Sequence, residues 1–320
     1  GSNYYFTPYA EALAAKLCEH SGLTNVFFCN SGAEANEAAL KLARKVGMMS
    51  GQAHKNQIVA FKNAFHGRTL FTVTAGGQPK YSQDFAPLPE GIQHTAFNDL
   101  DAAKALINEH TCAVIVEPIQ GESGVIIPPA GYLRDLRELC DKYGALLAID
   151  AVQTGMGRTG FWFGYEHEEI VPDIITVAKG FGGGLPLGAM IAIGPASHLL
   201  KPGEHGSTFG GNPVSCAAGL AAIREVEKKA LNEKALEMGE FLKSELIKIE
   251  GVTEVRGRGL LLGIALEQDW AKEIANFLLA KGVLVNAPNV NTISIAPPLI
   301  VTKAECAKFV KIFAEVMANG

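Results

Sequence analysis

The chain has 320 residues, of which 48% are hydrophobic and 19% are charged, and its formal net charge is -5. This length is enough for one large domain and one smaller domain. The acidic balance and the lack of a run of Lys and Arg argue against nucleic acid or an anionic membrane surface as a partner. No apolar stretch of the sequence is long and uninterrupted enough to span a bilayer.

Six cysteines are scattered along the sequence, with no Cys-x-x-Cys pair among them. Several fall in apolar runs such as VFFC and TCAVIVE, which is typical of buried thiols in a reducing compartment. We therefore expect neither a disulfide framework nor a zinc site, and we assign no metal to this protein. No signal peptide is visible, so the expected location is the cytoplasm.

The first two thirds of the sequence alternate between predicted strands and helices. Residues 7–20 have helical periodicity, a second helix is expected from about Gly32, and residues 130–143 have an amphipathic pattern. Short apolar runs bounded by turn residues predict buried strands at Asn25–Cys29, Gln57–Phe61, Ala113–Glu117, Ala145–Asp150, Asp173–Ala178 and Ala189–Ile193. This alternation indicates an α/β fold with a mainly parallel, doubly wound sheet.

The pattern changes after Asn212, where two long helical stretches follow one another. The remaining segments predict strands at Thr253–Arg256, Gly259–Ala265, Val283–Leu284 and Ile293–Ile295, and helices at about 269–281 and 302–318. These segments indicate a smaller α+β domain. We expect residues 1–220 to form the large domain and residues 221–320 to form the small C-terminal domain.

Two charged residues stand at the ends of predicted buried strands. Asp150 ends the run ALLAID, and Lys179 ends the run DIITVAK. Because ligands of open α/β sheets bind outside the carboxyl ends of the strands, both side chains should reach one crevice. Pyridoxal phosphate needs this pair, since a lysine forms its Schiff base and a carboxylate keeps its pyridine nitrogen protonated.

Each of these residues, taken alone, has a more ordinary interpretation. A lysine at a strand end is usually a solvated surface residue, and a carboxylate there often caps the next turn. Glycines at 180 and 182–184 favour a ligand site at Lys179, because they let the backbone approach a ligand closely. The polar, glycine-rich segment after Asp150 would bring Gln153 near the same crevice.

Two segments are candidates for binding a phosphate. In the turn 30–33, the N–H groups of a helix N-terminus could bind the anion, whereas the ordinary alternative is a helix cap made by Ser31 and assisted by Glu34. The second segment is GSTFGGNP, residues 206–213, in which Ser207 and Thr208 offer hydroxyl groups. Its ordinary alternative is a glycine-rich loop that connects two domains.

Further candidates follow two other predicted strands. Phe65 could stack on a flat ring, and Arg68 could pair with a carboxylate through two hydrogen bonds. Core packing and a plain surface charge are the ordinary alternatives. Glu117 and Glu122, in the segment EPIQGE, bring two more carboxylates to the same edge. Five strand ends then bring a turn, an aromatic ring, two acids and a lysine to one side of one sheet, as expected for an active site in this architecture.

At this point the chain resembles a known family, the class III (ornithine-type) aminotransferases of the fold-type I pyridoxal-phosphate enzymes. Within that family it is most similar to the acetylornithine aminotransferase group. The segments that carry the resemblance span nearly the whole chain: NSGAEANEAALKLAR, FHGRT, VEPIQGESGV, QTGMGRTG, AKGFGGGLPLGAM, STFGGNPVSCAAGLAA and RGRGLLLGI.

The resemblance implies a role for each candidate residue. Lys179 would carry the cofactor and shuttle a proton, Asp150 would hold the pyridine nitrogen, and Gln153 would hold the ring hydroxyl. Arg68 would bind a substrate carboxylate, and Glu122 would act as a gating acid that pairs with a second arginine. The remaining cofactor-binding residues would be Ser31, Gly32, Ala33, Phe65, His66, Ser207 and Thr208, with Phe65 on the ring face and Thr208 reaching the phosphate of the other subunit of a homodimer.

The sequence departs from the family pattern at three places. Ala151 stands where the family has Glu, and Ser294 stands where it usually has an arginine for the α-carboxylate of glutamate. By the resemblance, members carry a further N-terminal segment, and this sequence begins after it. The activity implied is transfer of the ω-amino group of N-acetylornithine to 2-oxoglutarate. The alternatives are an ornithine, 4-aminobutyrate or succinyl-diaminopimelate aminotransferase, or a catalytically impaired relative that binds the cofactor.

Overall fold

The structure is a computed structural model that describes residues 4–49 and 54–319. The chain divides into two compact units. The first unit contains the chain up to Pro118, together with Pro128–Met156 and Tyr165–Glu225. The second contains Ile119–Ile127, Gly157–Gly164 and the chain from Val226 onward, so two short segments of the N-terminal part of the sequence belong to it.

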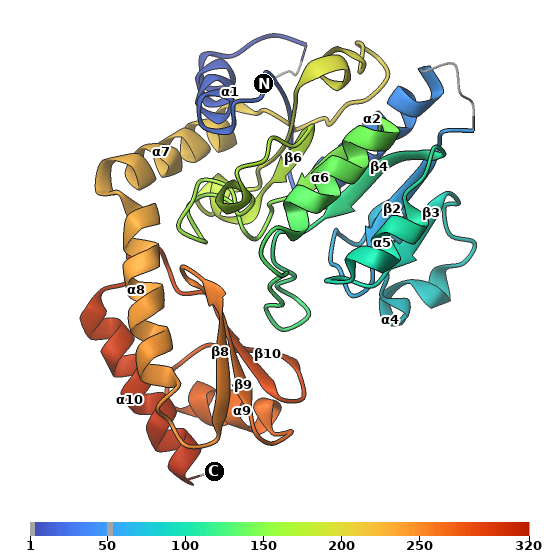
Figure 1. Cartoon of the computed structure of the whole chain (residues 1–320). Helices are drawn as coiled ribbons and strands as arrows, with labels where there is room; N and C mark the ends of the chain where they lie inside the picture. Colours follow the sequence, from blue (N-terminus) through green and yellow to red (C-terminus); the bar gives the residue numbers. More distant parts are fainter. Residues whose placement is uncertain (1–3, 50–53, 320) are drawn as a thin grey trace. The chain divides into compact units, whose positions relative to one another are not determined.

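The first unit is built around a seven-stranded sheet with the strand order β1-β7-β6-β5-β4-β2-β3 (Figure 1). Its strands are β1 (Asn25–Cys29), β2 (Gln57–Phe61), β3 (Ile92–Thr95), β4 (Thr111–Val116), β5 (Leu146–Asp150), β6 (Ile174–Val177) and β7 (Gly188–Ala192). The β3-β2-β4-β5-β6 pairs are parallel, whereas β7 is antiparallel to both of its neighbours. The prediction of a mainly parallel α/β sheet is therefore confirmed.

Helices accompany this sheet, as Figure 1 shows for α2 and α6. Their bounds are α1 (Pro8–Ser21), α2 (Gly32–Met49), α3 (Leu70–Ala75), α4 (Pro79–Ser82), α5 (Leu100–Leu106), α6 (Tyr132–Tyr143) and α7 (Pro213–Lys229). Every residue of β4, β5, β6 and β7 is buried, which explains why these strands have continuous apolar runs instead of alternating patterns. The α2 helix contributes Leu40 and Leu42 to the same core.

The second unit contains a four-stranded antiparallel sheet in the order β10-β11-β9-β8. Its elements are β8 (Val252–Arg258), β9 (Leu261–Leu266), β10 (Asn286–Asn289), β11 (Thr292–Ile295), α8 (Leu231–Leu246), α9 (Ala271–Ala280) and α10 (Lys303–Asn319). A separate apolar core, with Phe313 completely buried, holds these elements together. This unit has the α+β character expected for the C-terminal part of the chain.

One predicted strand in the second unit is wrong. Val283 and Leu284 lie outside any strand, and the strand of this region is β10, which begins at Asn286. The Val283 N–H donates to the carbonyl of Leu278 at 2.9 Å, which closes the end of α9, and Gly282 next to it has a φ of 77°. The backbone that looked available for strand pairing is therefore used to end a helix.

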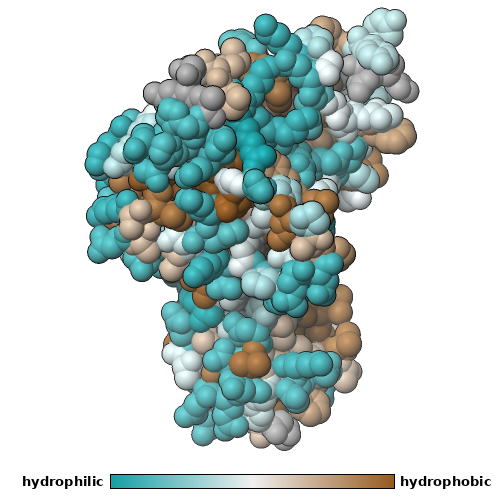
Figure 2. Space-filling model, turned by 90° about the vertical axis from the view of Figure 1, so that its right-hand side faces the viewer, coloured by the Kyte–Doolittle hydropathy of each residue, from teal (hydrophilic) through white to brown (hydrophobic). Residues whose placement is uncertain are grey.

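Hydrophilic residues cover most of the face shown in Figure 2, and hydrophobic residues are interspersed among them. Across residues 4–49 and 54–319, no helix is both long enough and apolar enough to cross a membrane.

Candidate active site

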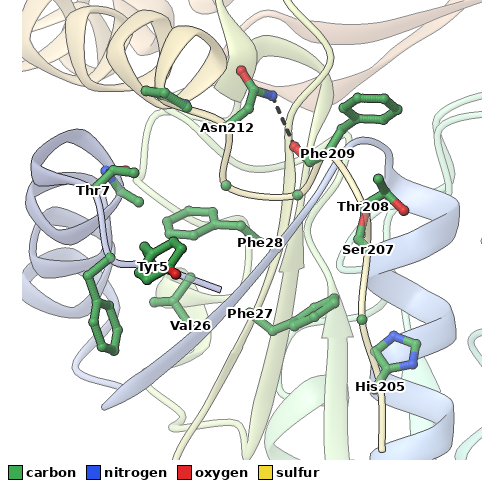
Figure 3. Close-up of a pocket in the computed structure, with 16 residues that line it drawn as sticks. Tyr5, Thr7, Val26, Phe27, Phe28, His205, Ser207, Thr208, Phe209 and Asn212 are labelled. Carbon is green, nitrogen blue, oxygen red and sulfur yellow. Dashed lines mark hydrogen bonds between the residues drawn. The ribbon is translucent and has the colours of Figure 1, made fainter. Parts of the chain in front are cut away.

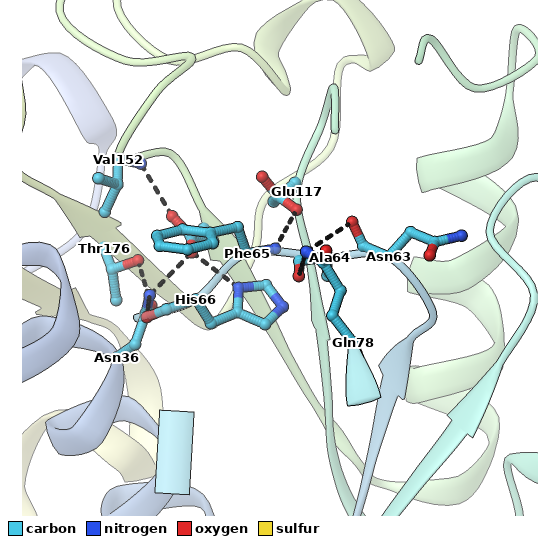
Figure 4. A network of polar contacts seen from close by, with 10 residues as sticks. Asn36, Asn63, Ala64, Phe65, His66, Gln78, Glu117, Val152 and Thr176 are labelled. Carbon is cyan, nitrogen blue, oxygen red and sulfur yellow. Dashed lines mark hydrogen bonds and ion pairs between the residues drawn. The ribbon is translucent and has the colours of Figure 1, made fainter. Parts of the chain in front are cut away.

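The carboxylate of Asp150 is the centre of a buried polar network at the carboxyl end of β5 (Figure 4). Asp150 is 4% exposed. Its Oδ2 accepts a hydrogen bond from Asn36 Nδ2 at 2.8 Å and lies 2.8 Å from His66 Nδ1, while its Oδ1 accepts the N–H of Val152 at 3.0 Å. Asn36 and Val152 donate to this carboxylate, and His66 donates to it as well in the tautomer that carries the ring proton on Nδ1.

The two residues on either side of Asp150 in the network come from different elements. His66 lies in the loop after β2, is 2% exposed, and its Nε2 has no hydrogen-bond partner among the described residues. Asn36 lies in the second turn of α2, and its Oδ1 accepts a hydrogen bond from Thr176 Oγ1 at 2.7 Å. The network thus joins β2, β5, β6 and α2 at one point.

Ala151 departs from the family pattern without opening this network. It is completely buried, and its N–H donates to the carbonyl of Thr176 at 2.9 Å. A glutamate at this buried position would need a partner for its charge. The polar support of Asp150 comes instead from the three donors around it.

Phe65 is fixed by its backbone rather than by its ring. Its N–H donates to Glu117 Oε2 at 3.1 Å, and the preceding carbonyl of Ala64 accepts from Gln78 Nε2 at 2.8 Å (Figure 4). The ring makes an edge contact with Tyr81, with centroids 6.2 Å apart. Glu117 therefore acts here as an acceptor that holds the Phe65 loop, a role that the sequence did not indicate.

Arg68 lies over two aromatic rings. Its guanidinium carbon is 4.1 Å from the centroid of Tyr81 and 5.4 Å from that of Phe65. Both distances are within the range of cation–π attraction. Arg68 is exposed, so its guanidinium edge stays available to a carboxylate while the rings hold its face.

The turn before α2 has the geometry of a capped helix N-terminus. The N–H of Glu34 donates to Ser31 Oγ at 3.2 Å, and Glu34 Oε2 accepts the N–H of Asn30 at 3.0 Å. The N–H groups of Gly32 and Ala33 belong to the first turn, where an α-helix provides no carbonyl partner. The cap and the phosphate site are therefore compatible, because the cap uses a different N–H group from those proposed for the anion.

Two glycines bring neighbouring segments against this turn. A Cβ on Gly67, which has a φ of 136°, would lie 2.7 Å from Ala33 Cβ, so the glycine allows the loop that carries Phe65 to touch the turn. A Cβ on Gly188 in β7 would lie 2.5 Å from the carbonyl oxygen of Ser31. Both positions require glycine for steric reasons.

Ser207 and Thr208 have different surroundings. Ser207 Oγ lies 3.0 Å from Glu34 Oε1 and 2.9 Å from Asn30 Nδ2, so it contacts the turn of the same chain. Thr208 is exposed, and both residues line a pocket of about 340 Å³ beside Phe28 and Phe209 (Figure 3). The structure thus brings Ser207, but not Thr208, to the predicted phosphate turn of its own chain.

Lys179 lies two residues beyond the end of β6, after Ala178, and begins a 3-10 helix, Lys179–Gly182. Its φ is 52°, a left-handed conformation that is uncommon for a residue with a side chain. Such backbone strain is concentrated at functional sites, where it aims a side chain that the local chain would otherwise direct elsewhere. Lys179 is exposed, and it lies just beyond the carboxyl end of β6.

The residues near Asp150 have spare polar capacity that suits pyridoxal phosphate. Gln153 Oε1 is buried and has no hydrogen-bond partner among the described residues. Asp150 Oδ1 accepts one hydrogen bond from Val152, which leaves it able to accept another. A ring hydroxyl and a pyridinium N–H would satisfy these two atoms, so the residues present fit the cofactor.

Glu122 and Ser294 belong to the second unit. The loop that contains Glu122 is held by Arg256, whose Nη2 donates to the carbonyl of Gly124 at 2.8 Å and to Thr292 Oγ1 at 3.1 Å. Ser294 lies in β11, opposite Gly263 of β9, and is half-buried. Their placement near the Asp150 network stays a prediction from the sequence.

Sequence reasoning missed Asn36, Thr176 and Tyr81. Asn36 is preceded by alanine on an apolar helix and reads as an ordinary helical position, yet it is 1% exposed. A signal was available, because Asn36 is four residues after Gly32 and so lies on the same face of α2 as the phosphate turn. No comparable pattern distinguishes Thr176 or Tyr81 in the sequence.

The sheet places an aspartate at the end of β5 and a lysine just beyond the adjacent strand β6, an arrangement that suits a pyridoxal-phosphate-dependent transferase. Residues 2–317 match the family described as Aminotransferase class-III, and the chain belongs to this family. The enzyme is therefore an aminotransferase whose cofactor is pyridoxal 5'-phosphate.

The most informative similarities are to enzymes of ornithine-like substrates. The chain is 49% identical to "Acetylornithine aminotransferase" of Neisseria meningitidis serogroup B. The aligned region covers 96% of this chain and 79% of that protein. The chain is also 49% identical to "Succinylornithine transaminase" of Salmonella newport, over 98% and 78% of the two chains. The solved structure of the ornithine aminotransferase from Toxoplasma gondii superposes on this chain with a TM-score of 0.95 and 30% sequence identity. The superposition covers 100% of this chain and 78% of the Toxoplasma chain.

Proposed function

We propose that the enzyme moves the ω-amino group of N-acetylornithine to 2-oxoglutarate, a step of arginine biosynthesis. The observation that carries this proposal is the 49% identity to acetylornithine aminotransferases over almost the whole chain. The intact donor network around Asp150 supports an enzyme that still holds its cofactor. Pyridoxal phosphate, when bound, would take up the electrons released when a substrate C–H bond breaks.

The residues of the first unit would then bind the cofactor and transfer the proton. Lys179 would bind the cofactor covalently and move a proton at the substrate carbon as a general base and then an acid. Asp150, oriented by His66, would accept the pyridine N–H, and Gln153 would contact the ring hydroxyl. The N–H groups of Gly32 and Ala33 would bind the phosphate.

Substrate binding would use the two remaining predicted residues. Arg68 would pair with the carboxylate of the amino donor, because its guanidinium edge is exposed while its face lies on Tyr81. Glu122 would act as the gating acid from the loop held by Arg256. Ser294 stands where the family pattern has the arginine for the α-carboxylate of glutamate, so that carboxylate would have one partner fewer in this sequence.

We further propose a homodimer in the cytoplasm, in which Thr208 reaches the phosphate of the other subunit. Phe209, next to Thr208, is 71% exposed, and Tyr5 and Phe6, which line the same pocket, are 78% and 92% exposed. Exposed aromatic side chains gathered at one pocket are typical of a surface that another chain covers. Sedimentation of the loaded enzyme at several concentrations tests this assembly.

The activity is tested by spectroscopy of the purified enzyme with added pyridoxal phosphate. We expect a visible absorbance band from the lysine-bound cofactor, its loss on addition of N-acetylornithine, and its return on addition of 2-oxoglutarate. Lys179→Ala is the control and should not give the band. A band that no ω-amine removes would contradict the proposal and favour a protein that only binds the cofactor.

A substrate panel decides between related donors. N-acetylornithine, N-succinylornithine, ornithine, 4-aminobutyrate and succinyl-diaminopimelate should each be compared by kcat/KM. We expect N-acetylornithine to give the highest value. A higher value for N-succinylornithine would replace the proposed donor by the substrate of the relative from Salmonella newport, which is equally similar in sequence.

A further inference from the structure

We propose that Asn36, held in place by Thr176, is a positioning residue that orients the Asp150 carboxylate toward the cofactor ring. The proposal rests on the proposed function, because it concerns the same site. It adds two residues to that site, Asn36 on α2 and Thr176 on β6, and a physical reason why they are asparagine and threonine.

The hydrogen bonds around Asn36 allow only one orientation of its amide. Asn36 Nδ2 lies 2.8 Å from the carbonyl oxygen of His66 and 2.8 Å from Asp150 Oδ2. A carbonyl oxygen can only accept, so the atom facing it must be the NH₂ group. Asn36 Oδ1 then accepts from the hydroxyl of Thr176 at 2.7 Å. A flipped amide would place two acceptors against each other at the His66 carbonyl.

This fixed amide determines how the Asp150 carboxylate is used. Asn36 and His66 both bind Oδ2, whereas Oδ1 has one partner, the N–H of Val152. Oδ1 is therefore the oxygen with room for a further donor such as a pyridinium N–H. Loss of the Asn36 donor would leave Oδ2 with His66 alone, so the carboxylate would be held less firmly against rotation about its Cβ–Cγ bond.

A role in packing alone does not explain an asparagine at this position. Asn36 is 1% exposed on a helix face that also buries Ala35 and Ala39. A buried amide is costly unless its polar atoms are paired, so an apolar residue would fit the core at lower cost. Both of its polar groups are used by residues that surround Asp150, and neither bonds to its own helix in the contacts described above.

Position along α2 gives Asn36 a second connection to the site. Gly32 and Asn36 are four residues apart and so lie on one face of the helix, one turn from each other. Two successive turns of one helix would therefore serve the two ends of the cofactor, the Gly32 N–H at the phosphate and Asn36, through Asp150, at the ring. Such a rigid element holds two ends of a ligand at a fixed separation.

The test uses three variants of the full chain and one matched control. Asn36→Leu removes both polar atoms, Asn36→Asp keeps the shape but replaces the NH₂ donor, and Thr176→Val removes the hydroxyl that fixes the amide. Asn108→Asp is the control, because Asn108 makes its side-chain hydrogen bonds to the backbone of residues 106 and 110, outside the Asp150 network. The readouts are the dissociation constant of pyridoxal phosphate, the visible band of the lysine-bound cofactor against pH, and the thermal stability of the cofactor-free protein.

We expect Asn36→Leu to raise the dissociation constant by about tenfold to a hundredfold, as for loss of a hydrogen bond to a charged group. Thr176→Val, which removes only the neutral hydrogen bond, should raise it by about threefold to tenfold. In Asn36→Asp, the new carboxyl can donate its proton to Asp150 at low pH, but two carboxylates oppose each other at higher pH. Its cofactor affinity should therefore fall as pH rises, while the unaltered enzyme and Asn108→Asp show no such fall.

Two results would overturn the inference. One is an Asn36→Asp enzyme whose affinity and visible band follow those of the unaltered enzyme at every pH. The other is an Asn36→Leu enzyme that folds and binds the cofactor normally. If Asn36→Leu does not fold, the Asn36→Asp and Thr176→Val variants decide the matter. Failure of the unaltered enzyme to form a lysine-bound band would instead overturn the proposed function, and this inference with it.

Discussion

The guanidinium of Arg68 lies over the ring of Tyr81, with its carbon 4.1 Å from the ring centroid, and Lys80 Nζ lies 4.6 Å from the same centroid. Tyr81 also meets Phe65 edge to ring. One aromatic side chain therefore contacts both the residue proposed to stack on the cofactor and the residue proposed to bind the substrate carboxylate. This relationship makes Tyr81 a determinant of how Arg68 is presented.

Replacing Tyr81 by Leu should weaken binding of the amino donor. Loss of the cation–π contact, worth about 0.5 to 2 kcal/mol, should raise KM by roughly twofold to thirtyfold with a smaller change in kcat. Tyr81→Phe keeps the ring and is the matched control, so its KM should stay close to that of the unaltered enzyme. Steady-state kinetics with N-acetylornithine measures both values. A Tyr81→Leu enzyme with unchanged KM would remove Tyr81 from substrate binding.

Gly188 and the Ser31 carbonyl are close enough to predict the effect of a single methyl group. Gly188→Ala places its Cβ 2.5 Å from that carbonyl oxygen, so the turn before α2 must move. Overpacking of this kind costs about 1 to 3 kcal/mol, and the shift should also weaken cofactor binding. Urea unfolding and a cofactor titration measure the two effects. Gly206→Ala, at a glycine with no atom within 4 Å of an added Cβ, should leave stability nearly unchanged.

The sequence predicted those parts of the fold whose signal is local. The strands Asn25–Cys29 and Gln57–Phe61 have the predicted bounds, because each is an apolar run that ends at a polar or turn residue. The strand Ile92–Thr95 was not predicted, since it is a short edge strand with the sequence IQHT and no apolar run.

In the candidate site, too, the residues marked by a local sequence pattern were predicted, and those that depend on contacts between distant parts of the chain were not. Asp150 and Lys179 were identified because strand ends and glycine-rich turns mark them in the sequence. Asn36 and Thr176 were missed because their importance depends on contacts across 114 and 140 residues of chain, respectively. The spacing of Asn36 from Gly32 indicates the helix face on which Asn36 lies, but no local pattern indicates its hydrogen bonds to residues of two strands.

The lowered pKa of His94 leads to a prediction of how the free energy of unfolding changes with pH. Burial is the largest cause that lowers the pKa of His94 below its usual value. Hydrogen bonds to the backbone of Thr74 and Ala75 oppose this effect in part, and electrostatic interaction with Lys62 adds to the lowering. Between the folded pKa and the usual value of about 6.5, the unfolded chain binds a proton that the folded protein does not. This contribution to stability is therefore complete above about pH 6.5 and decreases as the pH falls through that value toward the folded pKa.

His94→Gln isolates that contribution. Glutamine can still donate to the carbonyl of Thr74, which His94 Nε2 contacts at 2.8 Å, but it does not titrate. The free energy of unfolding in urea should fall less steeply for the variant than for the unaltered protein between about pH 7 and pH 5. Equal slopes for the two proteins would show that His94 does not contribute to the acid sensitivity of the fold.

The difference in burial among the cysteines leads to a prediction of which thiols react with a chemical label. Five of the six are buried and Cys18 is intermediate, so the expectation of buried thiols is confirmed for five of them. Burial raises the pKa of Cys29 and Cys140 to about 12, and that of Cys112 and Cys216 to about 11. At pH 8 their thiolate fraction is then on the order of a thousandth or less.

A thiol reagent at pH 8 should therefore react with the folded protein in one early step at Cys18, and with the other cysteines only after unfolding. Cys18→Ser should abolish the early step and leave the later reaction unchanged. Mass spectrometry of the labelled peptides identifies the sites, and labelling in urea gives the total of six. Early labelling of Cys29 would contradict the prediction, because this thiol is buried and its pKa is raised. Cys29 lies opposite Gly188 in the β1–β7 pair, just before the turn proposed to bind phosphate. Protection of Cys29 by pyridoxal phosphate in a partly unfolded sample would, conversely, link that turn to cofactor binding.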